Sequence, residues 1–264
     1  MRTTRAICAL LLVVCLAVVL IPMQWLALKC NWPIQRYIPV YWHRWILKIL
    51  GIRVNVLGKV ADSRPLLVTS NHTSWLDILV IGSLQPLSFI AKSEVATWPI
   101  FGLLAKLQRT IFIDRSRRRD TMRVNEAISN RMNSGDAIVL FAEGTSSNGN
   151  EVKPFRSSLL GAVHQAMQTS ATHSATVQPL SIAYTRLHGM PMGRMWRPHV
   201  AWYGNMELLQ HLWSICGEGG LDVEVHFGEP TKYGAEFNRK QVAKQMEAEV
   251  RSMTLAALYG KSSA

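Results

Sequence analysis

The longest apolar stretch of this 264-residue chain lies near its start and constrains what the remainder can be. No charged side chain occurs from Ala6 to Leu28, and about 20 apolar residues in a helix can cross the roughly 30 Å hydrocarbon core of a bilayer. A secretory signal peptide is the alternative. However, the stretch exceeds an ordinary signal h-region, no small-x-small cleavage motif follows, and Lys29 precedes Cys30. We therefore expect residues 1–30 to form a retained transmembrane anchor.

Basic residues on the two sides of this stretch predict its orientation. Two arginines precede it, and a larger basic set follows: Lys29, Arg36, Arg44, Lys48 and Arg53. Because cytoplasmic loops carry the excess of Lys and Arg, we expect the rest of the chain to lie on the cytoplasmic side of a bacterial inner membrane. The four cysteines are consistent with this, since two lie in the apolar stretch and Cys30 and Cys216 show neither a disulfide framework nor metal-ligand spacing. No metal site is predicted.

Residues 31–59 form an amphipathic segment. Within it, Tyr37–Ile52 combines Trp42, Trp45 and aliphatic residues with His43, Arg44 and Lys48, a composition typical of a helix that lies in the headgroup region. An ordinary amphipathic core helix has the same composition. Because Trp is enriched at membrane–water interfaces, we favour the interfacial helix.

From residue 60 onward, short apolar runs typical of strands alternate with helical segments. This pattern predicts an α/β domain over residues 60–264, with a single sheet flanked by helices and no internal boundary. The expected strands are Leu66–Thr69, Leu87–Ala91, Thr110–Ile113, Ala137–Phe141, Val177–Tyr184 and Val223–Phe227. The expected helices are Trp75–Leu84, Phe101–Leu107, Thr121–Met132, Ser157–Gln168 and Arg239–Leu258, with loops at Thr169–Ala175 and Gly217–Gly220.

A polar block follows the first predicted strand and reads Asn71-His72-Thr73-Ser74-Trp75-Leu76-Asp77. A histidine at the carboxyl end of a strand can accept a proton from a substrate hydroxyl, and a carboxylate five residues later can hold the other ring nitrogen. Taken alone, the spacing could be coincidental, with Asp77 complementing a helix N-terminus. Ser74 lacks the features of an activated serine elbow, so we expect it to have a local capping role.

Three further blocks follow. Ile111-Phe112-Ile113-Asp114-Arg115 precedes three more arginines at positions 117–119, which fit a solvated or lipid-facing charge run, whereas Arg115 sits where it can bind a phosphate or carboxylate.

In Phe141-Ala142-Glu143-Gly144-Thr145-Ser146-Ser147, Gly144 permits close backbone approach to a ligand and Glu143 and Thr145 offer polar groups, although an ordinary capped turn is the alternative. The run from Val177 to Ala183 is an apolar strand with Pro179 near its start.

In this order and spacing, the four blocks resemble the glycerolipid acyltransferase family, which includes lysophosphatidate acyltransferase; the resemblance spans roughly Asn71 to Ala183. It implies that the chain is an enzyme that transfers a fatty acyl group to a lysolipid hydroxyl. An acyl thioester of acyl carrier protein or coenzyme A would serve as co-substrate, and no cofactor is implied. It implies His72 as general base, Asp77 as its orienting partner, and Arg115, Glu143, Gly144 and Thr145 as acceptor-binding residues. Further candidate site residues, not taken from the resemblance, are Asn71, Ser74, Lys92, Ser146 and Arg156; Lys92 could border the acyl tunnel, although ordinary packing explains it about as well.

Two positions depart from the family pattern: Ala142 replaces a proline and Ser146 replaces an arginine. Loss of a planar cationic fork should weaken phosphate recognition. The wider segment Phe141–Gly161 looks most like the lyso-ornithine lipid O-acyltransferase branch, which acylates the hydroxyl of a 3-hydroxyacyl amide of ornithine. We expect lyso-ornithine lipid as the acceptor, acyl carrier protein as the donor and membrane lipids as further partners. Lysophosphatidate is the alternative acceptor, because Arg156 could supply the missing charge.

The formal net charge of +12 leaves another class of protein to consider. A membrane-tethered nucleic-acid-binding protein would interleave basic residues with stacking aromatics on one element. Here the tryptophans concentrate near the anchor instead, so no nucleic-acid partner is expected. A catalytically inactive scaffold of the same fold is a further alternative, against which the intact His72 and Asp77 pair argues.

Overall fold

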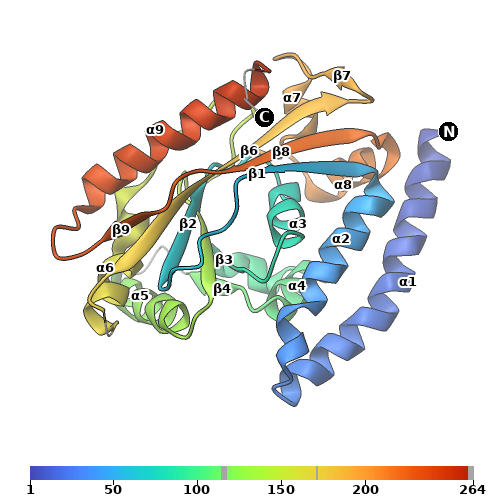
Figure 1. The fold of residues 1–264 in the computed structure, drawn as a ribbon. Helices are drawn as coiled ribbons and strands as arrows, with labels where there is room; N and C mark the ends of the chain where they lie inside the picture. Colours follow the sequence, from blue (N-terminus) through green and yellow to red (C-terminus); the bar gives the residue numbers. More distant parts are fainter. Residues whose placement is uncertain (114–117, 171, 261–264) are drawn as a thin grey trace.

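One mixed sheet organises the chain (Figure 1). The computed structural model describes residues 1–113, 118–170 and 172–260. It describes the side chains of these residues except those of residues 118–124. In this part, strands follow the order β1-β8-β6-β2-β5-β3-β4, and β7 and β9 pair with β6. The strands are β1 (Ile52–Leu57), β2 (Leu66–Ser70), β3 (Ser88–Lys92), β4 (Ile111–Ile113), β5 (Ala137–Phe141), β6 (Ala175–Leu187), β7 (Met190–Pro191), β8 (Leu221–Phe227) and β9 (Thr231–Tyr233). The predicted α/β class with a single sheet flanked by helices is confirmed.

The centre of the sheet is parallel. β2 pairs in parallel with β5 and β6, and β3 pairs in parallel with β5 and β4. Every residue of β2 and β5 is buried, as is typical of parallel strands covered on both faces. By contrast, β8 runs antiparallel to β6 and alternates buried with half-buried residues. Because β2, β5, β3 and β4 run in one direction, their carboxyl ends lie at the same edge of the sheet.

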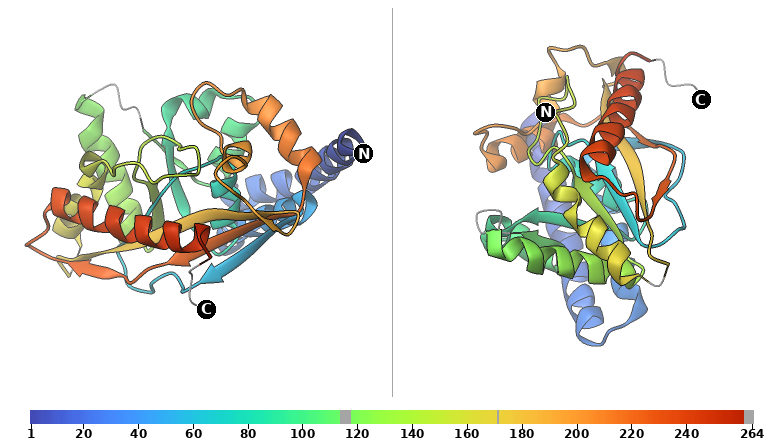
Figure 2. Two further views of the ribbon diagram at one scale, coloured as in Figure 1. Left: turned by 90° about the horizontal axis from the view of Figure 1, so that it is seen from above. Right: turned by 90° about the vertical axis from the view of Figure 1, so that its left-hand side faces the viewer.

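Helices cover both faces of the sheet, which gives two buried cores. Leu67 of β2 belongs to the core shared with α5, α6 and α9, whereas its neighbours Leu66 and Val68 belong to the core shared with α1, α2, α3 and α8, as the alternation of a strand requires. In Figures 1 and 2, α9 and α1 lie on opposite sides of the molecule. The helices are α1 (Arg2–Lys29), α2 (Ile38–Leu50), α3 (Leu76–Gly82), α4 (Phe101–Leu107), α5 (Arg118–Asn133), α6 (Gly161–Thr169), α7 (Arg197–Val200), α8 (Leu208–Glu218) and α9 (Arg239–Leu258), with short 3₁₀ turns at Pro33–Arg36, Ser93–Thr97 and Ser157–Leu160.

The observed elements differ from the predicted ones mainly before residue 60 and after residue 174. The sequence indicated neither β1 nor α8, and β6 extends beyond its predicted ends, where it pairs with β7 and β9. β1 pairs in parallel with β8 over its whole length. The sheet therefore begins at residue 52, inside the segment 31–59 that was expected to be interfacial, because a strand far along the chain supplies its partner.

α1 is apolar and mostly uncovered. It is the helix in the described residues whose length and composition would allow it to cross a bilayer, and only 11% of its most apolar stretch of 18 residues is buried. Yet both of its ends are attached to the rest of the fold. Arg5 donates hydrogen bonds to the carbonyls of Leu50 and Cys216, and Gln24 Nε2 donates to the Leu107 carbonyl at 2.7 Å. α1 is thus a structural brace as well as an apolar helix.

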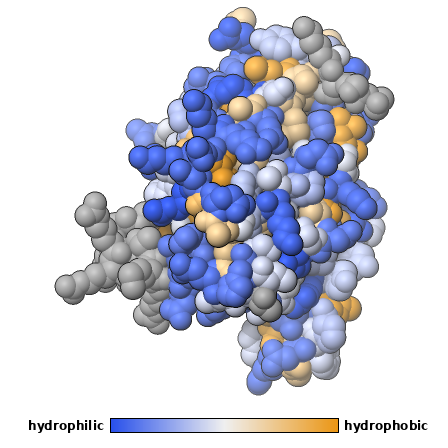
Figure 3. All heavy atoms as spheres, turned by 60° about the vertical axis from the view of Figure 1, so that its left-hand side comes forward, coloured by the Kyte–Doolittle hydropathy of each residue, from blue (hydrophilic) through white to orange (hydrophobic). Residues whose placement is uncertain are grey.

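The predicted amphipathic helix exists as α2 and ends at Gly51, whose φ of +70° suits a helix C-terminus. Its apolar side packs into the protein, where Ile46 and Leu50 join the core. Tyr41 and Trp45 remain exposed on its other side. The part of the surface drawn in Figure 3 is mostly hydrophilic, and hydrophobic and hydrophilic residues adjoin at its lower end, where Figure 1 places the α1–α2 connection. The interfacial position of α2 stays a prediction.

Candidate active site

The sheet topology brings two of the polar blocks together. β2 and β5 are neighbouring parallel strands, and Ser70 at the end of β2 lies opposite Phe141 at the end of β5. The residues that follow each strand therefore share one edge of the sheet. The backbone N–H of His72 donates to Glu143 Oε1 at 3.1 Å, and the N–H of Ser147 donates to the His72 carbonyl at 2.8 Å. The first and third blocks form one site.

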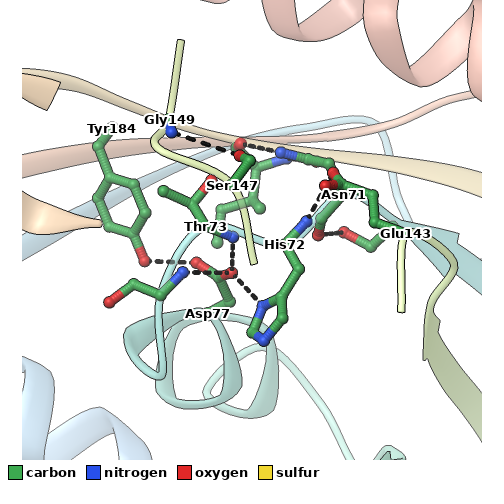
Figure 4. A network of polar contacts seen from close by, with 11 residues as sticks. Asn71, His72, Thr73, Asp77, Glu143, Ser147, Gly149 and Tyr184 are labelled. Carbon is green, nitrogen blue, oxygen red and sulfur yellow. Dashed lines mark hydrogen bonds and ion pairs between the residues drawn. The ribbon is translucent and has the colours of Figure 1, made fainter. Parts of the chain in front are cut away.

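His72 and Asp77 form a close pair (Figure 4). Nδ1 of His72 lies 2.8 Å from Oδ2 of Asp77. Asp77 is in the first turn of α3 and its side chain is 0% exposed, whereas the His72 side chain is 19% exposed. A carboxylate at Nδ1 favours the tautomer that carries the proton there, which leaves Nε2 free to accept a proton. The geometry is that of a general base held by a buried anion.

Four donors converge on the Asp77 carboxylate. Besides His72, the N–H groups of Thr73 and Ser74 donate to Oδ2 at 2.7 and 3.0 Å, and the Tyr184 hydroxyl donates to Oδ1 at 2.6 Å. Burial, the Asp77 charge and this hydrogen bond raise the pKa of Tyr184 well above its ordinary value, so the phenol stays a donor. A fully desolvated carboxylate needs such donors. Tyr184, which lies on β6, was not identified from the sequence.

The position of the His72 ring is fixed from one face. It stacks on Phe141 with ring centroids 4.1 Å apart and an interplanar angle of 19°. The carbonyl of the next residue, Thr73, accepts a hydrogen bond from the Trp202 N–H at 2.9 Å, which ties the loop to the chain beyond α7. Stacking and backbone contacts together limit how far the imidazole can move, and this preorganisation favours catalysis.

Glu143 supports the site from inside the protein. It is buried, with Oε1 accepting from the His72 N–H, and Oε2 has no hydrogen-bond partner among the described residues. Burial raises the pKa of Glu143 to about 8, against the opposing effects of the hydrogen bond from His72 and of nearby Lys153. The carboxyl is therefore neutral near pH 7. The structure places Glu143 beside the backbone of His72, where it positions the loop, and the predicted contact of Glu143 with an acceptor stays a prediction.

Replacing Glu143 with glutamine tests this neutral state. The folded-state pKa of about 8 lies above the ordinary value of 4.5, so the protonated carboxyl contributes stability that is fully present below about pH 4.5 and is lost as the pH rises through 8. The neutral amide has no such dependence. Between pH 5.5 and 8.5 we expect the wild-type Tm to fall by at least about 3 °C relative to that of Glu143→Gln, measured by differential scanning fluorimetry. Parallel pH profiles would contradict the assignment.

Asn71 and Ser74 are both buried, but their side chains differ in hydrogen bonding. The Asn71 side chain exchanges two hydrogen bonds of 2.9 Å with the backbone of Ile182, so it links the end of β2 to β6. The expected capping role of Ser74 is wrong. Its hydroxyl has no hydrogen-bond partner among the described residues, and the residue at the N-cap of α3 is Trp75. The Asp77 N–H donates to the backbone carbonyl of Ser74 at 3.0 Å instead of to its hydroxyl.

The part of the site formed by residues 144–146 is more accessible than the part around Asp77. Gly144 is half-buried with a φ of +73°, a conformation that suits glycine, and Thr145 is exposed. The Ser146 carbonyl accepts a hydrogen bond from Lys153 Nζ at 2.7 Å. Lys153, which the sequence did not indicate, therefore brings an ammonium group next to the backbone of Ser146, the residue that replaces the family's arginine.

The remaining candidates lie further out. Lys92 is exposed at the carboxyl end of β3, and Arg156 is exposed with its backbone N–H bonded to the Ala142 carbonyl at 2.9 Å. Arg115 lies outside the described residues. Within the described residues, no group of three or more His, Cys, Asp or Glu side chains is arranged to hold a metal ion.

Comparisons with known proteins agree with this geometry. A family model described as Acyltransferase matches residues 51–183. Lyso-ornithine lipid O-acyltransferases of Brucella abortus (strain 2308) and Rhizobium meliloti (strain 1021) are 48% and 44% identical to the chain. They cover 98% and 97% of it, and the matches span 97% and 88% of those relatives. A solved 1-acyl-sn-glycerophosphate acyltransferase from Thermotoga maritima shares the fold, with a TM-score of 0.67, 21% identity and full coverage of both chains. The chain belongs to the acyltransferase family and is an acyltransferase.

Proposed function

We propose that this acyltransferase acylates the hydroxyl of lyso-ornithine lipid and so completes a membrane lipid. The observation that carries the proposal is the identity of 48% and 44%, over nearly the whole chain, with two enzymes that bear this name. A 1-acyl-sn-glycerol-3-phosphate acyltransferase of Neisseria meningitidis serogroup B (strain ATCC BAA-335 / MC58) is 32% identical over 70% of the chain and 68% of that relative. The greater similarity is thus to enzymes named for the ornithine lipid.

The His72 and Asp77 pair supports a direct transfer without a covalent enzyme intermediate. Nε2 of His72 takes the proton of the acceptor hydroxyl while its oxygen attacks the thioester carbonyl carbon. The tetrahedral intermediate then collapses, the carbon–sulfur bond breaks, and the proton passes from His72 to the leaving thiolate. Asp77 stabilises the transient imidazolium, and four hydrogen bonds hold its carboxylate in place. Because the thioester is already activated, positioning and proton transfer suffice.

The head-group side of the site supports an acceptor without phosphate. Ser146 stands where the family pattern has an arginine, and the Lys153 ammonium is bound to the Ser146 carbonyl. A lysine is a point charge rather than a bidentate fork. A single ammonium suits the carboxylate of an ornithine head group, whereas a phosphate monoester would be held less well.

The donor and the location are part of the same proposal. An acyl carrier protein thioester is the proposed donor, and the bacterial inner membrane, with the catalytic domain on the cytoplasmic side, is the proposed location. The exposed apolar residues of α1 and the basic residues that follow it support membrane attachment.

A side-by-side assay tests the acceptor and the donor. The purified full chain in detergent is given lyso-ornithine lipid or lysophosphatidate, each with thioesters of acyl carrier protein and of coenzyme A. We expect kcat/KM for lyso-ornithine lipid to exceed that for lysophosphatidate at least tenfold, and Lys153→Gln to raise KM for the ornithine lipid more than it lowers kcat. Lysophosphatidate is the second candidate because the Neisseria relative acts, by its name, on a glycerol phosphate. Faster turnover of lysophosphatidate would overturn the choice of acceptor and leave acyl transfer intact.

A further inference from the structure

A polar cavity lies at the amino ends of the parallel strands, opposite the candidate active site. It has a volume of about 220 Å³ and is lined by the residues before β2, β3 and β5 together with the α1–α2 connection. One water occupies roughly 30 Å³ in the liquid, so the cavity has room for a larger group. Five residues of β2 separate it from the active-site block, a distance of roughly 17 Å. The cavity is therefore distinct from the candidate active site.

Arginines dominate the charge of this cavity. Arg36, Arg109 and Arg131 all point at one carboxylate, that of Asp136, with N···O distances of 3.6, 3.3 and 3.2 Å. Arg36 and Arg109 line the cavity, as does a fourth arginine, Arg64, which donates hydrogen bonds to backbone carbonyls, including that of Gly135 at 3.1 Å; Arg131 reaches Asp136 from outside the lining. We call these four arginines and Asp136 the arginine pocket.

The positive charge of the arginine pocket exceeds what Asp136 can neutralise. The Asp136 side chain is 8% exposed, whereas those of Arg109 and Arg36 are 25% and 47% exposed. Burial lowers the pKa of Arg109; Asp136 opposes this effect, and the like charges of Arg131 and Arg36 add to it. Each guanidinium has five N–H donors, and one carboxylate has two oxygens. Arg64 and Arg131 also donate to backbone carbonyls, and Asp62 is a second acid near Arg64. Arg36 and Arg109, which line the cavity, have more donors than the shared Asp136 carboxylate can accept, and an anion bound there would relieve the repulsion between them.

The rim of the arginine pocket is suited to a membrane surface. Trp32, Ile34 and Tyr37 of the α1–α2 connection are exposed beside Arg36. Lys29 lies over the ring of Trp25 near the end of α1, 5.2 Å from its centroid. Trp and Tyr at the level of lipid head groups, next to basic residues, are typical of membrane interfaces. Apolar and hydrophilic residues adjoin at this end of the molecule in Figure 3.

We propose that the arginine pocket binds a phosphate group, and that an anionic phospholipid head group at the membrane surface supplies it. Arginine forks pair bidentately with phosphate oxygens, and the exposed aromatic rim would enter the head-group layer at the same time. Binding there would fix the α1–α2 end of the protein on an anionic bilayer. This role does not depend on which lysolipid the active site accepts.

The test uses the full chain in detergent as the wild type, the single variant Arg36→Gln and the double variant Arg36→Gln/Arg109→Gln. Lys244→Gln, which removes one exposed charge from α9, is the control. Inorganic phosphate and a short-chain phosphatidylglycerol below its micelle concentration are added separately, and Tm is measured. Co-sedimentation with phosphatidylcholine vesicles, with and without 20% phosphatidylglycerol, gives the membrane-bound fraction. Arg36 is half exposed, so its single variant should fold even if the double variant does not.

We expect phosphatidylglycerol to raise the Tm of the wild type and of Lys244→Gln by at least about 2 °C, and that of the Arg36 variants by less than half as much. The bound fraction on anionic vesicles should fall at least threefold for the Arg36 variants only. A response to inorganic phosphate without one to the lipid would support the phosphate site but overturn the lipid as its source. Equal responses in all variants, or none in the wild type, would overturn the proposal.

Discussion

Replacing His72 with alanine is expected to lower kcat for acyl transfer by about 10³-fold, the size of effect typical of losing a positioned general base. Nε2 of His72 faces the accessible side of the site, while Nδ1 is held by Asp77 at 2.8 Å. No other described imidazole contacts Asp77, so nothing replaces the lost proton acceptor. The measurement is the initial rate with saturating donor and acceptor.

A matched control separates lost chemistry from lost structure. The ring of His72 is partly exposed and stacks on Phe141, so its removal should change Tm by only a few degrees. His164→Ala, at an exposed position on α6, should keep wild-type kcat. If His72→Ala retained more than a tenth of the wild-type rate, the general-base role would be wrong and an inactive scaffold or a different mechanism would have to be considered.

Asp77→Asn is expected to reduce kcat by up to about 10⁴-fold, the loss found when the carboxylate of a comparable His–Asp pair becomes an amide. The amide oxygen can still accept from Thr73 and Ser74, and its NH₂ group can face the Tyr184 oxygen, so the local fold can persist. The negative charge that stabilises protonated His72 is lost. We therefore expect low activity at nearly unchanged Tm.

Tyr184→Phe is the companion variant, with the opposite expected pattern. It removes one donor from a buried carboxylate and leaves the other three. An unsatisfied buried acceptor costs about 1–3 kcal/mol of unfolding free energy, so Tm should fall by several degrees while kcat falls less than tenfold. If Tyr184→Phe lost more activity than Asp77→Asn, the phenol would have a role in the reaction that the hydrogen bond to Asp77 does not explain.

Local sequence pattern predicts the central elements of the fold and fails at its edges. β5, α4 and α9 begin and end at the residues that the sequence predicts. The start of α9 is fixed by a local contact, because the Asn238 side chain accepts a hydrogen bond from the Lys240 N–H at 3.0 Å and caps the helix. β1 alternates apolar residues with arginine and asparagine directly after a helix, and among the described residues it pairs with β8 alone. Its existence depends on a pairing across the whole domain, which no local window contains.

The same distinction applies to the candidate site. His72 and Asp77 are five residues apart, so a loop and one helical turn bring them together, and their spacing together with the family resemblance predicted the contact. Tyr184 is 107 residues from Asp77 and reaches it only through the parallel register of β2 with β6. The arginine pocket draws on four separate segments of the chain. Contacts that depend on sheet register or on packed loops could not be derived from residue order.

The attachment of α1 at both ends has a practical consequence for anyone who wants a soluble version of this enzyme. Cutting the chain after residue 30 would remove the Arg5 and Gln24 side chains from the carbonyls they satisfy and would uncover the sides of α2 and α8 where Ala6 and Ala9 pack. The first helix is a part of the folded body, and solubilisation is better sought by replacing its outward-facing residues than by deleting it.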